Sequence, residues 1–296
     1  MERKQSEKWQ GRMSRTINST VCFSLAYVLL TFMLWFASGL AGRLYKFDSL
    51  VYYYGIKFIL NGHGWSKMKV IAIYSAGAVS IFFLATLALF LYSGLKRVKT
   101  LFNVFFLWIF VIGIGIFLSQ IIIVSLGIYH YNSPYYQGLA VAFSWLKFPA
   151  FLVYLLLFFA FLFLVYIGVN VARPFLAFSY SFSKVNNLSR RRKYFFEIAI
   201  APFLVGALVS CIAVFPKDSA AKSVLLLLGS THLIYIAVIA LILGIGWLSL
   251  SYIELNKQEL VRYNSLQMPN VFFIVLTLVA WTLIYVSLHG IYLSVT

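Results

Sequence analysis

A histidine in the middle of an apolar run is the first residue of this chain that could do chemistry. His232 lies in the stretch LLLLGSTHLIYIAVIA, with no charged residue within nine positions on either side. Ionisable residues at membrane depth often mark functional sites, and an imidazole can bind a ligand or exchange a proton. Tyr235 follows three residues later and therefore shares a helical face with His232. Gln120 lies deep in another apolar run, behind Gly113 and Gly115.

Two interpretations of these polar side chains are open. His232, Tyr235 and Gln120 would together form a polar substrate-binding site inside the membrane. Alternatively, they hydrogen-bond neighbouring helices, which is the ordinary use of polar residues in membrane helix packing. A metal site is not expected, because a lone intramembrane histidine lacks a second and third ligand.

His63 is a further candidate for substrate binding, at the outer membrane interface. It stands between two glycines, in the stretch LNGHGWSKMK. The glycines give the backbone freedom to present the imidazole to a ligand. A flexible turn anchored by Trp65 explains the same residues equally well.

The acidic residues indicate which chemistries the chain lacks. All seven Asp and Glu residues lie in tails, in loops or at the edges of apolar runs. Proton-coupled and cation-coupled transporters commonly use carboxylates at mid-membrane, and the sequence has none there. It also has no His-Glu-x-x-His zinc motif and no phosphate-binding Gly-x-x-x-x-Gly-Lys-Ser/Thr loop. We therefore expect no catalytic residues and no cofactor, and the sequence favours a protein that is not an enzyme.

The densest positive charge is the run Arg190-Arg191-Arg192-Lys193. Such a run fixes membrane topology, and it can also bind anionic lipid headgroups on the inner side or a protein partner. The formal charge of the whole chain is +17. Nucleic acid is not an expected partner, because nearly all Lys and Arg residues sit in short segments between apolar runs.

The elements that must position these side chains are long apolar helices. Hydrophobic residues make up 62% of the 296 residues and charged residues only 10%, a composition typical of an integral membrane protein. We expect an all-α polytopic bundle of about seven transmembrane helices, at 19–41, 70–94, 102–128, 149–171, 197–215, 223–252 and 270–293. The fifth is the weakest, because Pro202 lies inside it. Residues 1–18 are expected to form a basic cytoplasmic tail, and residues 19–296 a single transmembrane domain.

Two connections are too apolar for ordinary loops and too short to span a membrane. They are Ser49–Leu60 and Tyr135–Phe148, and both are expected to form short interfacial or re-entrant helices. Each begins with tyrosines and a glycine, at 52–55 and 135–138, which suggests a duplicated unit or a coincidence in an aromatic-rich chain.

The distribution of basic residues predicts the orientation. With the N-terminus inside, 16 Lys and Arg residues fall on the inner side and 8 on the outer side. The positive-inside rule then favours an inside N-terminus and an outside C-terminus. If the fifth helix does not cross, the C-terminus moves to the inside. Short loops fit the cytoplasmic membrane of a bacterium.

Three classes of function remain open. The first is a non-catalytic subunit or scaffold of a membrane complex, with a protein partner in the membrane. The second is an uncoupled or partner-driven permease for a lipidic or weakly polar substrate, suggested by the glycines of the third and sixth helices and by the repeat. The third is a membrane-embedded enzyme acting on lipid, with His63 or His232 as base.

Overall fold

The structure is a computed structural model, and it describes residues 2–52, 55–59, 64–95, 101–129, 136–179, 182–212, 222–253, 255, 270–287 and 290–294. The long helices are α1 (Glu2–Leu44), α2 (Lys67–Gly94), α3 (Leu101–Gly127), α5 (Ala150–Ala177), α8 (Lys222–Ser249) and α9 (Val271–Ser287). The shorter helices are α4 (Leu139–Trp145), η2 (Phe182–Lys184), α6 (Leu188–Phe195), η3 (Phe196–Ile200) and α7 (Ala201–Ile212). The strands are β1 (Asp48–Tyr52), β2 (Gly55–Ile59) and β3 (Ile291–Leu293).

Five of the described helices are long and apolar enough to cross a membrane. They are Arg12–Leu44, Lys67–Gly94, Leu101–Gly127, Ala150–Ala177 and Thr231–Ser249. These helices confirm the expected fold class, a helical membrane bundle, but not the number of crossings. The expected fifth and seventh transmembrane helices are present as shorter apolar helices, α7 and α9, so a total of seven crossings stays a prediction.

The centre of the bundle is α3, which packs against α1, α2, α5 and α8. Its two interior glycines allow this crowding. A Cβ on Gly113 would lie 2.8 Å from Ala85 on α2, and a Cβ on Gly115 would lie 2.6 Å from Ile239 on α8. The glycines of the third helix therefore serve close packing of helices on two sides.

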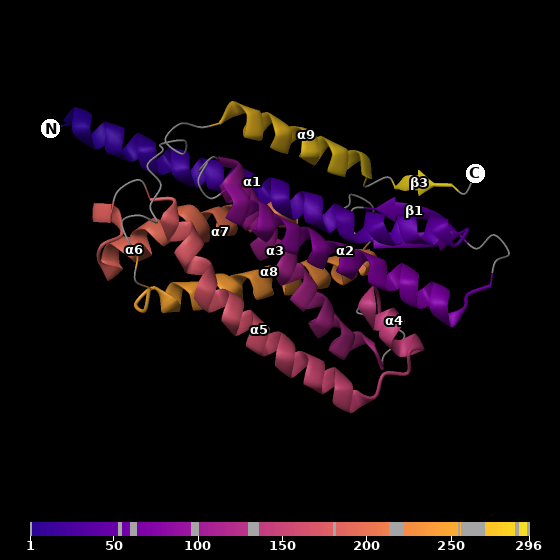
Figure 1. Ribbon diagram of the computed structural model, residues 1–296. Coiled ribbons are helices and arrows are strands. Elements are labelled where there is room, and N and C mark those ends of the chain that lie inside the picture. The colour runs from indigo at the N-terminus through magenta and orange to yellow at the C-terminus, as the bar shows by residue number, and fades with distance from the viewer. Residues whose placement is uncertain are drawn as a thin grey trace.

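In contrast to the buried helix α3, α5 has an outer face with a row of exposed aromatic side chains. Figure 1 shows this helix along one edge of the bundle. The exposed aromatic residues are Phe151, Tyr154, Phe158, Phe159, Phe161, Phe163 and Tyr166. On a helix long and apolar enough to span a membrane, such a face is suited to contact with lipid chains.

The predicted interfacial helix at Ser49–Leu60 is wrong, because this segment contains two strands. β1 and β2 pair antiparallel, with Leu50 opposite Lys57, and β3 from the C-terminal end of the chain pairs with the other edge of β1. Both strands contain β-branched and aromatic residues, which favour strands: Val51 and Tyr52 in β1, and Ile56, Phe58 and Ile59 in β2. The small three-stranded sheet thus qualifies the all-α expectation.

The second predicted interfacial helix is present over part of its range, as α4, which packs against α2 and α3. The repeated tyrosine–glycine pattern therefore has no common structure: Gly55 begins a strand, and Gly138 precedes a helix. Tyr53, Tyr54 and Tyr135 lie outside the described residues. The duplicated unit is not supported by the elements that follow the two glycines.

The last helix, α9, packs along the first helix, α1. The backbone N–H of Asn270 donates to Asn18 Oδ1 at 2.9 Å, and the Thr277 hydroxyl donates to the Val21 carbonyl at 3.4 Å. The two helices therefore run in the same direction, and β3 then joins the sheet beside the last turns of α1, where Gly39 faces Val51 and Leu293. As a result, α1 begins at one end of the bundle and β3 lies at the other (Figure 1).

Pro202 is accommodated by a wide turn and by hydroxyl groups of α1. The helix from Leu188 to Ile212 is continuous, but η3 within it is a π-helical turn, and the Ala201 N–H donates to the carbonyl five residues back. Pro202 has no N–H, so the carbonyls of Glu197 and Ile198 cannot receive one from it. They accept instead from Thr16 Oγ1, at 3.0 Å, and from Ser19 Oγ.

Candidate functional site

A basic pocket lies at the end of the bundle where α1 begins. Its volume is about 360 Å³, within the range of roughly 300–1,000 Å³ that ligand pockets occupy. The lining residues are Arg12, Arg15, Ser183, Lys184, Arg190, Lys193, Tyr194 and Glu197, from α1, η2, α6 and η3. Five of them are basic and one is acidic, so the formal charge of the lining is +4. We call this hollow the basic pocket.

The four basic residues of α6, Arg190 to Lys193, do not all belong to the basic pocket. Asn187 caps the helix, with its Oδ1 accepting from the Arg190 N–H at 2.9 Å. Arg190 and Lys193 are three residues apart, so they lie on the same helical face and both line the pocket. The sequence predicted a single patch, and the structure places two of its four members in the pocket.

The other two members of the run lie outside the pocket. Arg191 binds backbone carbonyls: its Nε donates to Val185 at 2.8 Å, and its Nη1 donates to Leu250 at 3.4 Å and to Ile253. It therefore ties α6 to the segment after α8. Arg192 is exposed and does not line the pocket.

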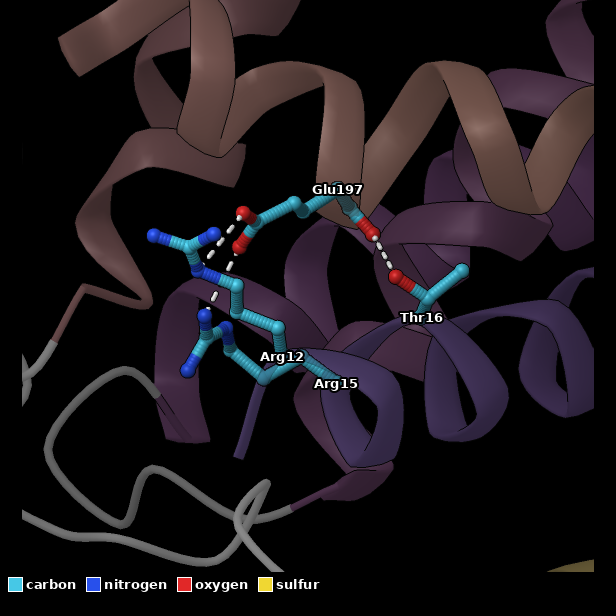
Figure 2. Close-up of polar contacts among 4 residues, drawn as sticks. All are labelled: Arg12, Arg15, Thr16 and Glu197. Atoms are coloured by element: carbon cyan, nitrogen blue, oxygen red, sulfur yellow. Dashed lines mark hydrogen bonds and ion pairs between the residues drawn. The ribbon is translucent and has the colours of Figure 1, made fainter. Parts of the chain in front are cut away.

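Glu197 joins α1 to the pocket by ion pairs, which Figure 2 shows. Its carboxylate lies 2.7 Å from Arg15 Nη2 and 3.5 Å from Arg12 Nε. The Arg15 side chain is only 4% exposed, and Glu197 is 15% exposed. A charge as buried as Arg15 is costly without a counter-charge, and Glu197 supplies it.

Arg15 has bonding capacity beyond this ion pair. Its guanidinium lies over the Tyr194 ring, 5.6 Å from the centroid, which is within cation–π range. Its Nε is buried and makes no hydrogen bond with the described residues. A guanidinium has five N–H donors, and this one is left unsatisfied by the described residues.

Sequence reasoning missed most of this pocket. Arg12 and Arg15 were assigned to a tail, and Glu197 to the edge of a span. One signal was available in the sequence, because Glu197 is one of only seven carboxylates and lies shortly before Pro202. Nothing in the sequence shows that Arg15 lies beside a residue 182 positions away.

The predicted intramembrane site is a set of paired contacts between helices. The Tyr27 hydroxyl and His232 Nδ1 lie 2.8 Å apart, and the tautomer of the imidazole decides which atom donates. Gln120 Nε2 donates to the Tyr235 hydroxyl at 2.7 Å. The rings of His232 and Tyr235 meet edge to face, with centroids 5.6 Å apart. The three residues predicted together are thus brought together, and Tyr27 is added to them.

These polar side chains are turned toward one another. His232 is 5% exposed, and Tyr27, Gln120 and Tyr235 are at most 1% exposed. Toward the α4 end, Gln137 Nε2 donates to Thr231 Oγ1 at 2.8 Å. The contacts connect α1, α3 and α8 with the segment before α4, and their chemistry is that of helix association. His63 lies outside the described residues.

Comparisons with known proteins leave the site to be interpreted from its own residues. No family model, no curated protein and no solved structure matches the chain. Among the described residues, no three His, Cys, Asp or Glu side chains lie together as a metal site would require.

Proposed function

We propose that this integral membrane protein is a non-catalytic subunit or scaffold of a membrane complex. The observation that carries the proposal is the pairing of polar side chains at membrane depth. A transporter or an enzyme acting on lipid needs polar groups that a substrate can reach. Tyr27, His232, Gln120 and Tyr235 instead bond one another across helices and are at most 5% exposed.

The glycines of α3 and α8 support the same conclusion. Gly113 and Gly115 are in close approach to Ala85 and Ile239, and a Cβ on Gly246 would lie 2.9 Å from Val171 on α5. Small residues at these positions bring helices together. They were the main reason to consider a permease, and close packing accounts for these three without a substrate path.

We place the protein in the cytoplasmic membrane of a bacterium, with its N-terminus inside. The distribution of basic residues, 16 against 8, supports this orientation. It puts the basic pocket on the cytoplasmic side and the small sheet on the outer side. The exposed faces of α5 and α9 are among the surfaces that a partner within the membrane can meet, and α2 exposes Phe83 and Phe90 as well.

Photo-crosslinking in native membranes tests the scaffold function. A photoreactive aromatic residue replaces exposed Phe158 on α5 or exposed Leu278 on α9, and the matched control replaces buried Phe175 on α5. Purification in mild detergent and mass spectrometry then identify the products. We expect one protein to be crosslinked from an exposed position and to co-purify at a fixed ratio, with none from Phe175. A chain that purifies alone, with no protein crosslinked from either face, would overturn the proposal.

A further inference from the structure

We propose that the basic pocket binds a phosphate group, carried by the headgroup of an anionic membrane lipid. The lining brings together five cations from three parts of the chain around one carboxylate. This site is separate from the intramembrane contacts and does not depend on the scaffold function.

The donor set of the pocket suits a phosphate. Arginine donates in a planar fork that matches phosphate oxygens, and lysine adds a point charge. Arg15 is the most buried of the cations, and its Nε makes no hydrogen bond with the described residues. The exposed Arg190 and Lys193 lie on the open side, where an entering anion would meet them first.

The charge of the pocket selects among phosphates. Glu197 already neutralises part of Arg12 and Arg15, which leaves a formal charge of +4 on the lining. A phosphomonoester carries nearly two negative charges near neutral pH, whereas a phosphodiester carries one. We therefore expect phosphatidic acid to bind more tightly than phosphatidylglycerol, and zwitterionic phosphatidylcholine to bind least.

The position of the pocket points to a lipid as the carrier. Arg12 and Arg15 lie on α1 just before its apolar run, which the sequence places at 19–41, and α1 is one of the helices long enough to span a membrane. The pocket is therefore at the level where lipid headgroups meet such helices. Free inorganic phosphate shares the chemistry but gains nothing from this location.

The test uses the purified full-length chain in detergent, with lipid retention followed by native mass spectrometry. The added lipids are phosphatidic acid, phosphatidylglycerol or phosphatidylcholine, and a separate arm adds inorganic phosphate as competitor. The pocket variant is Arg190→Gln with Lys193→Gln, both at exposed positions. Arg190 Nη1 also donates to the Ser183 carbonyl at 2.6 Å, so the stability of this variant is measured as well. Arg192→Gln is the matched control, because it removes one charge from the same helix outside the pocket.

We expect each pocket substitution to weaken phosphatidic acid binding about fivefold, so that the double variant loses roughly twenty-fivefold. Arg192→Gln should change the affinity by less than about twofold, as an exposed charge outside the site. Glu197→Gln should strengthen binding, because Arg12 and Arg15 lose their internal anion. Thermal unfolding of each variant without lipid tests whether the fold is kept, and Glu197→Gln should unfold at a lower temperature because Arg15 loses its counter-charge.

Three results would overturn the proposal. An equal loss for Arg192→Gln would mean that any basic charge at this end attracts lipid. Equal binding of phosphatidic acid and phosphatidylcholine would remove the phosphate selectivity. Competition by inorganic phosphate at the same concentration as the lipid would reassign the pocket to a soluble phosphate. Because the purified chain is tested alone, none of these results depends on whether a protein partner exists.

Discussion

Tyr27 on α1 and His232 on α8 are separated by 205 residues in the sequence, yet the hydroxyl oxygen of one lies 2.8 Å from Nδ1 of the other. One helical turn further along α8, the Tyr235 hydroxyl accepts from Gln120 on α3. Three helices are thus linked at one level of the bundle. In an apolar surrounding, where water cannot replace a lost partner, such links specify which helix faces meet.

Removing the Tyr27 hydroxyl should destabilise the bundle. Tyr27→Phe leaves His232 without that partner, and an interhelical hydrogen bond in a membrane protein contributes about 0.6 kcal/mol on average and up to about 1.7. We expect a loss in this range, measured by unfolding of the purified protein in detergent. Tyr154→Phe on α5 is the control, because Tyr154 is 67% exposed. Equal stability of the two variants would mean that the Tyr27 hydroxyl contributes nothing to the fold.

The contact between Gln120 and Tyr235 can be measured as a coupling energy. We compare Gln120→Leu, Tyr235→Phe and the double variant by the same unfolding assay. Because the amide and the hydroxyl bond each other at 2.7 Å, the double variant should lose less than the sum of the single losses. We expect a coupling of about 0.5–1.5 kcal/mol. Strictly additive losses would show that the two groups act independently.

The substitution Ser19→Ala tests how the proline in the fifth helix is accommodated. Ser19 donates to the Ile198 carbonyl and accepts from Trp108 Nε1 at 2.9 Å, so the variant leaves two buried groups unpaired. We expect a loss of about 1–3 kcal/mol. In a Pro202→Ala background the restored N–H can serve the carbonyl, and Ser19→Ala should then cost less. An equal cost in both backgrounds would mean that the proline does not create the need for Ser19.

The membrane bundle was predictable from the sequence because long apolar runs have few ways to satisfy their backbone in lipid. The five longest helices follow directly from such runs. Short apolar runs carry less information, since both strands and helices fit them. For Ser49–Leu60 the deciding partner is β3, about 240 residues later in the chain, and no local pattern shows that pairing.

The candidate sites likewise contain some residues that the sequence indicates and others that only the fold brings in. His232 and Tyr235 share a helical face by their spacing alone, and Gln120 was identified by its depth in an apolar run. Tyr27 was missed because its segment is apolar on all sides, so no pattern marks the face that meets α8. Arg190 and Lys193 became part of a pocket only once α6 was seen to lie against the start of α1, with Glu197 between them.

The two ends of the chain should lie on opposite sides of the membrane. α9 runs in the same direction as α1, and β3 pairs with β1 beside the last turns of α1, so we expect an odd number of crossings between the two ends. An epitope tag at the N-terminus should be protected from added antibody in intact cells with a permeabilised outer envelope. A tag at the C-terminus should be accessible there, because the basic residues favour an inside N-terminus. Detergent should expose both tags, as a control for the antibody. Protection of both tags in intact cells would place the ends on the same side and would contradict the pairing of β1 with β3.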